Sequence, residues 1–98
     1  MEIIFLRAAE DDLFKAWVSY EEILPGLGDR FEKEVRIALD RIQLFPESAP
    51  VYTGEFRRLL VPRFQHGIFY RAHGARILVA AVLDLRQDPK TIVERLRF

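Results

Sequence analysis

The apolar residues of this chain change their spacing near residue 46, and that change constrains the fold more than any other feature. Before it, they recur every three or four residues, in one stripe of Leu13, Trp17, Tyr20 and Leu24 and a second of Phe31, Val35, Ala38, Leu39 and Ile42. After it, they gather in short runs separated by glycine and proline. A period near 3.6 is typical of helices, and short bounded runs are typical of strands. The order therefore predicts helices first and a sheet afterwards.

Residues that start and stop helices mark the ends of the two stripes. The first helix is expected from Ala9, with acidic residues in its first turn that suit the positive end of the helix dipole, and Pro25-Gly26 ends it. Asp29 is expected to cap the second helix and Pro46 to stop it. Two amphipathic helices joined by a few residues form an antiparallel helical hairpin.

Strands are expected on both sides of this hairpin. The run Ile3–Leu6 is expected to be a strand buried on both faces. The segment 46–55 is expected to be a loop, because two prolines and a glycine interrupt it. Three strands are expected after it at Phe56–Val61, Gly67–Ala72 and Arg76–Asp84, and the last, being the most apolar, is expected to be central.

The end of the chain predicts a short third helix. Asp88 fits an N-cap and Pro89 the first helical position, with Ile92, Val93 and Leu96 on one face. Neither a repeat nor a linker divides the 98 residues, so we expect one domain, 1–98. The predicted fold class is α+β in the order β-α-α-β-β-β, with the helical hairpin packed on a small, mostly antiparallel sheet.

Charge is divided along the chain although the total is zero. Residues 1–50 carry six basic and eleven acidic side chains, whereas residues 51–98 carry nine basic and four acidic ones. Twelve of the fifteen basic residues are arginine, whose rigid fork of donors suits carboxylates and phosphates. A balanced net charge argues against a generic nucleic-acid binder. We therefore expect the basic half to face either the acidic half or an acidic partner.

Composition also bounds the chemistry and the location. The chain has no cysteine, which excludes disulfides and thiolate metal sites, and its two histidines are too few to argue for zinc, so no metal or cofactor is expected. The N-terminus does not read as a signal peptide, and the longest apolar run, Ile77 to Leu83, is too short to span a bilayer. We expect a cytoplasmic protein with no membrane partner.

The predicted order and several local sequences resemble the RelE/ParE superfamily of type II toxin–antitoxin toxins, which includes the plasmid stabilisation proteins. The resemblance rests on a strand before an acidic, aromatic-bearing helix, a second helix ending in LFPESAP, the stretch RRLLVPRFQHGIFYR, the strand ILVAAVLDL and the terminal RQDP. It covers nearly the whole chain and implies a RelE/ParE-like fold. It also implies a small toxin neutralised by an antitoxin encoded beside it. ParE-like members inhibit DNA gyrase, and RelE-like members cleave messenger RNA in the ribosome.

The RelE-like alternative requires a base, an acid and cations that stabilise charge on phosphorus. On the resemblance, the candidate catalytic residues of a metal-independent mRNA endoribonuclease are Arg58, His66 and Arg86. Two positions depart from the pattern, because Leu60 and Gly67 stand where basic residues are expected. The tail KTIVERLRF also has no tyrosine or histidine to act as acid or base.

A ParE-like toxin that binds a protein target is therefore the leading hypothesis. A sequence pI near 6.7 supports docking on a protein more than on the phosphate surface of a ribosome. The nuclease, and a diverged member that has lost toxicity, remain as alternatives.

The expected partner-binding residues come from the basic half: Arg58, Arg63, His66, Tyr70, Arg71, Arg86 and Lys90. Arg57 and Arg58 are consecutive in a strand and point to opposite faces, and we assign Arg58 to the open face. Tyr70 and Tyr20 have the alternative role of core residues. The resemblance implies that the antitoxin is disordered alone in its C-terminal segment and wraps the toxin. An acidic, apolar segment of this kind would match the arginines, and we expect it to cover Arg58, Arg63 and Arg86. The assembly could be a homodimer or a heterotetramer with the antitoxin.

Overall fold

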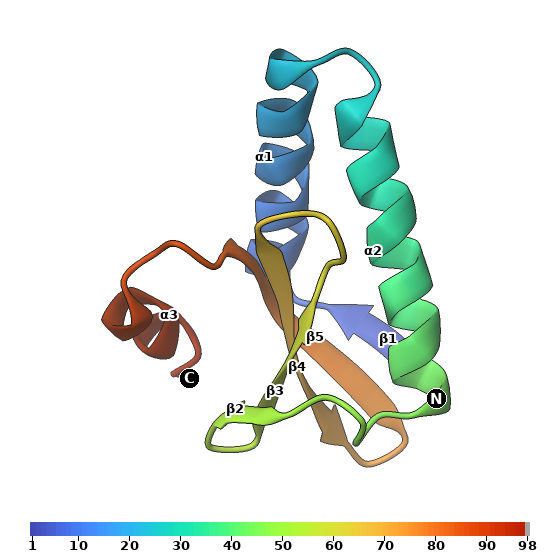
Figure 1. Ribbon diagram of the computed structural model, residues 1–98. Coiled ribbons are helices and arrows are strands. Elements are labelled where there is room, and N and C mark those ends of the chain that lie inside the picture. Colours follow the sequence, from blue (N-terminus) through green and yellow to red (C-terminus); the bar gives the residue numbers. More distant parts are fainter. Residues whose placement is uncertain (98) are drawn as a thin grey trace.

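The computed structural model describes residues 1–97, which form one sheet with helices against both faces (Figure 1). The elements are β1 (Glu2–Phe5), α1 (Arg7–Ile23), α2 (Leu27–Leu44), β2 (Val51–Thr53), β3 (Phe56–Leu60), β4 (His66–His73), β5 (Arg76–Asp84) and α3 (Pro89–Arg95). The expected α+β order is confirmed. β2 is an additional strand, within the segment expected to be a loop.

The sheet is mostly antiparallel, as expected, and its strand order is β1-β5-β4-β3-β2. Among the strands of residues 1–97, only β1 runs parallel to its neighbour, β5. The expectation that Arg76–Asp84 is central is wrong by one strand, because β1 adds outside β5 and leaves β4 in the middle. The expectation that Ile3–Leu6 is buried on both faces is also wrong, since this edge strand and the residue after it are only half-buried.

The helical hairpin covers one face of the sheet and extends beyond its end (Figure 1). Its core includes fully buried Phe31 and Val35 of α2, packed with Ile68 of β4 and Val79 of β5. The two helices approach closely at Gly28, where an added Cβ would lie 2.7 Å from the backbone oxygen of Trp17. A larger residue there would separate the helices.

The start of α2 is held by α1 and not by Asp29. The Glu21 carboxylate accepts hydrogen bonds from the backbone N–H groups of Gly26 and Gly28, at 3.0 and 2.9 Å. Gly26 is the N-cap residue and has a φ of +91°, a conformation that favours glycine. Asp29 lies in the first turn and accepts instead from the indole nitrogen of Trp17, at 3.0 Å. The expected Asp29 cap is therefore corrected.

The short helix α3 covers the opposite face, with Ile92 and Leu96 buried against Phe69 and Leu83. Its start agrees with the prediction, because Asp88 accepts from the backbone N–H of Lys90 at 2.9 Å and Pro89 stands at the first position.

An ion pair ties α3 to the hairpin. Asp12 of α1 binds Arg95 of α3 at 2.6 Å and also accepts from the backbone N–H of Val82, at 3.1 Å. Asp12 thus links elements that cover the two faces of the sheet.

Side chains from the sheet order the segment that leads into β2. Arg57 donates to the carbonyl oxygens of Glu47 and Ala49, at 3.1 and 2.8 Å, and the buried Tyr70 donates to the carbonyl oxygen of Pro46, at 2.8 Å. Backbone groups of a loop need such partners when they lie away from water. Within residues 1–97, no helix has the length and apolar character needed to cross a membrane.

Candidate partner-binding surface

The connection between β3 and β4 is anchored to the hairpin by aromatic rings. Phe64 packs edge-on against Tyr20 and Phe31, with ring centroids 4.9 and 5.2 Å apart. His66 packs on the same two rings at 5.4 and 5.2 Å. Tilted and edge-on contacts of this kind add to the stabilisation from burial. The connection is therefore fixed in place.

The Tyr20 hydroxyl completes that anchor. It accepts from the backbone N–H of Gln65 at 3.2 Å and lies 2.9 Å from Nδ1 of His66. Burial lowers the pKa of His66, so its neutral imidazole is favoured and Nδ1 can accept the hydroxyl proton. Burial also raises the pKa of Tyr20, which keeps the hydroxyl protonated. The expected core role of Tyr20 thus includes a polar contact across the fold.

Arg63 lies at the tip of this anchored connection in a strained conformation. Its φ of +71° falls in the left-handed region, where a residue with a side chain costs about 1 kcal/mol more than glycine. Its neighbours Val61 and His66 are joined by a backbone hydrogen bond of 2.9 Å, which closes the turn. The strain is confined to a residue whose side chain is exposed and cationic.

A groove separates this tip from the end of the hairpin. We call it the basic groove; its volume is about 400 Å³ and its lining is Tyr20, Ile23, Leu27, Arg30, Lys33, Glu34, Arg63 and Phe64. Three of these side chains are cationic, and among the described residues none of the three has an ion-pair partner. Four lining residues have apolar or aromatic side chains, Tyr20, Ile23, Leu27 and Phe64, and Ile23 is 72% exposed.

Arg86 lies on the same side of the sheet but is already paired. It donates to Asp84 through Nε at 3.0 Å and Nη2 at 2.6 Å. These hydrogen bonds hold the pKa of Asp84 down at about 2, and Asp84 in turn raises the pKa of Arg86. Arg86 lines a cavity of about 300 Å³ together with Tyr20 and His66.

Arg58 and Arg71 lie on the opposite face, toward α3. Arg58 pairs across the ladder with Phe69 of the α3-side core, and its guanidinium carbon lies 5.1 Å from the ring centre of Tyr52. Arg71 binds Glu55 at 2.5 Å and lies 5.8 Å from the ring centre of Phe56. Such contacts give both arginines roles within the fold. Arg57 and Arg58 point to opposite faces, as predicted.

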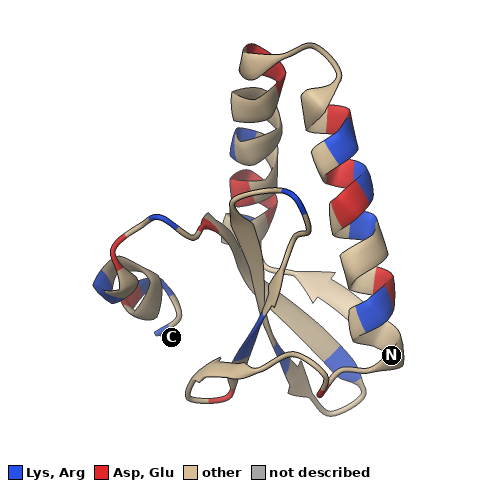
Figure 2. Ribbon diagram, in the orientation of Figure 1, with Lys and Arg blue, Asp and Glu red and all other residues tan. Residues whose placement is uncertain are grey.

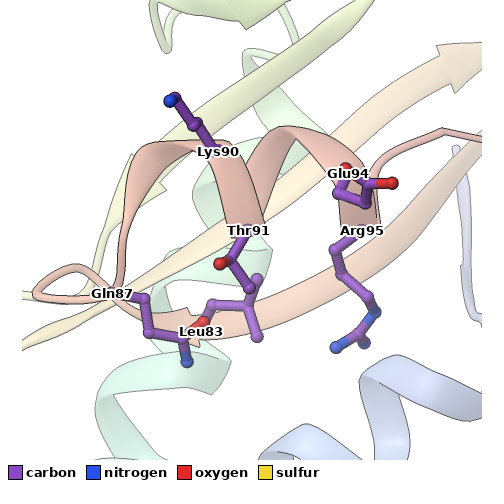
Figure 3. A pocket seen from close by; sticks show the side chains of 6 residues that line it. All are labelled: Leu83, Gln87, Lys90, Thr91, Glu94 and Arg95. Atoms are coloured by element: carbon purple, nitrogen blue, oxygen red, sulfur yellow. The ribbon is translucent and has the colours of Figure 1, made fainter.

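Of two other expected partner-binding residues, Tyr70 is buried and Lys90 is exposed. Tyr70 is fully buried and its hydroxyl is used by Pro46, which leaves no surface for a partner. We therefore omit Tyr70 from the docking surface. Lys90 is exposed on α3 beside a cavity of about 560 Å³, and its side chain points away from the other lining residues (Figure 3).

The sheet thus separates the three residues expected for a nuclease. His66 and Arg86 share a cavity on the hairpin side, whereas Arg58 faces α3. An in-line displacement at phosphorus needs its base, acid and cations around one reacting atom. Within residues 1–97, no group of three or more histidines and carboxylates is placed to hold a metal ion.

Two cationic residues of the basic groove, Arg30 and Lys33, lie outside the set of expected partner-binding residues. Both belong to the acidic half of the chain, and the division of charge directs attention away from them. Their spacing of three places them near one another on α2. The division of charge between the two halves of the chain is incomplete, because acidic and basic residues alternate along α2 (Figure 2).

Comparison with known proteins supports one family. The family described as ParE toxin of type II toxin-antitoxin system, parDE, matches residues 3–89. A solved structure titled "Chromosomal ParDE TA system from P. aeruginosa" superposes with a TM-score of 0.74 at 17% sequence identity, over 84% of this chain and 92% of that one. No curated protein matches the chain significantly. At that identity the structural match supports the fold, while the family match covers most of the sequence.

Proposed function

Because the chain belongs to the ParE family of type II toxin–antitoxin toxins, we propose that it arrests growth by docking on DNA gyrase. We further propose that a cognate antitoxin neutralises it through an acidic, apolar segment that occupies the basic groove. Both parts describe binding without a chemical step. The gyrase target comes from the action of the ParE-like branch, and the groove assignment comes from the geometry.

The observation that carries the proposal is the composition of the basic groove. Arg30, Lys33 and Arg63 line the groove together with apolar residues and one carboxylate, Glu34, and the three cations have no ion pair within the described residues. Carboxylates on an incoming segment would supply those partners, and its apolar side chains would cover Ile23 and Leu27. The strained Arg63 supports the same role, since strain of this kind clusters at functional sites.

The arrangement of the arginines favours this proposal over the ribosome-dependent nuclease. Arg58 and Arg86 are held by Tyr52 and Asp84 on opposite sides of the sheet. A nuclease would need cations directed at one phosphate. The resemblance leads us to expect that the antitoxin segment covers Arg58, Arg63 and Arg86 together, and we propose that it covers Arg63 and extends toward Arg86. Arg63 lies in the groove and Arg86 lies beyond Tyr20, but Arg58 is reached only from the α3 side.

A pair of activity assays tests the target. We expect the purified protein to inhibit supercoiling by purified DNA gyrase, and to leave messenger RNA intact in a translation extract. The antitoxin encoded beside the gene should relieve the inhibition. Cleaved message with normal supercoiling would replace the proposal by the nuclease. If supercoiling stays normal and the message stays intact, the result would support the alternative of a diverged family member that has lost toxicity.

Charge reversal tests where the antitoxin segment binds. The double variant Arg30→Glu/Arg63→Glu should weaken the complex more than about tenfold, or 1.4 kcal/mol, because each substitution turns an attraction into a repulsion. Arg58→Glu, on the other face, should change the dissociation constant less than about twofold. Arg7→Glu, at the opposite end of α1 from the groove, is the matched control. Equal losses for Arg58→Glu and the groove variant would place the segment elsewhere.

A further inference from the structure

A second groove lies along α1 and has the opposite charge. We call it the acidic groove; its volume is about 650 Å³ and its lining is Phe5, Glu10, Leu13, Phe14, Trp17 and Glu32. It shares no lining residue with the basic groove. The proposed function leaves this surface and the acidic charge of the hairpin unexplained.

The apolar part of the acidic groove is unusually accessible. Phe14 is 66% exposed in the middle of α1, and it lines the groove together with Leu13 and Trp17. The only polar atom of the indole, Nε1, is bound to Asp29, so the ring presents carbon to the groove. Covering a phenylalanine removes its apolar surface from water, which makes Phe14 an anchor for a partner.

The charges of the acidic groove select the partner. Glu10 and Glu32 are its charged lining residues, and no described arginine or lysine lines it. Glu32 pairs with Arg36 at 2.6 Å, but the Arg36 side chain is 75% exposed, so water screens that pair. Glu10 has no ion-pair partner within residues 1–97. Such a rim repels nucleic acids and anionic lipids and attracts lysine and arginine.

We propose that the acidic groove is a second docking site, which binds a cationic amphipathic segment of a partner protein. Apolar side chains of that segment cover Phe14 and Trp17, and its basic side chains pair with Glu10 and Glu32. Because the two grooves share no residue, an acidic segment and a cationic segment can bind at the same time. The proposal does not depend on the gyrase or antitoxin assignments.

The single tryptophan of the chain makes the site measurable. Trp17 lines the acidic groove, so its fluorescence responds to occupancy there and not at the basic groove. The probe is a short amphipathic helical peptide of leucine and lysine, compared with its leucine and glutamate counterpart. We expect the lysine peptide to shift the emission saturably to shorter wavelength at low salt, and the glutamate peptide to leave it unchanged.

Two variants with matched controls locate the binding. Phe14→Ser should raise the dissociation constant at least about tenfold, whereas Ile37→Ser, on α2 outside the groove and 53% exposed, should change it less than about twofold. Glu10→Gln/Glu32→Gln should weaken binding about fivefold and reduce its salt dependence, whereas Glu94→Gln on α3 should do neither. Circular dichroism checks that each variant is folded.

Three results would overturn the proposal. One is the absence of any shift of the Trp17 emission at a lysine-peptide concentration of about 1 mM. Another is an equal shift of the Trp17 emission by the lysine and glutamate peptides, which would mean apolar adhesion at the acidic groove without charge selection. The third is unchanged affinity in Phe14→Ser, which would place the peptide outside the acidic groove.

Discussion

The two faces of the sheet are covered in different ways. The hairpin side is covered by α1 and α2, of 17 and 18 residues, whereas the other side is covered by α3, of 7 residues. On the hairpin side, cations line an open groove without ion-pair partners among the described residues. On the α3 side, Arg58 and Arg71 rest against aromatic rings. We therefore expect the hairpin side to contribute most of the stability and to hold the proposed partner-binding surface.

The largest expected loss of stability comes from a substitution in the core on the hairpin side. Phe31 is fully buried and packs on the rings of Tyr20, Phe64 and His66, so Phe31→Ala should lower the free energy of unfolding by about 3–5 kcal/mol. Ile92→Ala is the counterpart on the α3 side and should cost less, because a short helix can detach without opening the hairpin core. Urea denaturation measures both. An equal or larger loss for Ile92→Ala would contradict the difference between the faces.

A smaller loss of stability is expected from a substitution of Asp12, which links α1 to α3 across the sheet. Asp12→Asn retains an oxygen for the backbone N–H of Val82 but removes the charge that holds Arg95, at a cost of about 1–3 kcal/mol. Hydrogen exchange should show lower protection in α3 and unchanged protection in α2. Asp11→Asn, at an exposed neighbouring position, is the control. Equal loss of protection in α2 would show that the two faces unfold as one unit.

The smallest effect is a pH dependence centred on the hairpin side. The pKa of His66 is lowered by burial, so the unfolded chain binds more protons than the folded one below the ordinary histidine pKa of 6.5. The stabilisation that neutral His66 contributes is therefore fully present above pH 6.5. It is lost as the pH falls toward the lower pKa that His66 has in the folded chain. Asp84 adds no slope there, because its pKa moves from 3.8 to about 2.

Urea midpoints between about pH 7.5 and 5 measure the slope. His66→Gln should flatten it, since glutamine retains an acceptor for the Tyr20 hydroxyl but does not titrate. His73→Gln, at the exposed β4–β5 turn, should leave the slope unchanged. A slope that persists in His66→Gln would assign the pH dependence to another group.

Much of the fold follows from local spacing. The helical hairpin, four of the five strands and the Asp88 cap depend on residues close in sequence, and local sequence patterns predict them. The misplaced features depend on distant partners. The cap of α2 comes from Glu21 of the preceding helix, and the segment that leads into β2 is held by Arg57 and Tyr70 from other strands.

The residues of the basic groove were likewise predicted from the sequence only in part. Arg63 was expected to bind a partner from its place in a resembling stretch, and the fold places it in the basic groove, although the binding itself is a proposal. Arg30 and Lys33 were missed because they become neighbours of Arg63 only after the hairpin packs beside the β3–β4 connection. Tyr70 is among the expected partner-binding residues with a core role as the alternative, and its side chain is fully buried in the core.

The sequence by itself determined the kinds and the order of the elements other than β2, because apolar spacing and turn residues act over a few positions. The family followed from the resemblance of local sequences along the chain. Only the tertiary structure decided which cations remain without ion-pair partners among the described residues. Arg71 meets Glu55 across 16 positions, and Tyr20 reaches His66 across 46. Pairing of charges and hydroxyls depends on distances between elements, and those distances are set by packing of the core.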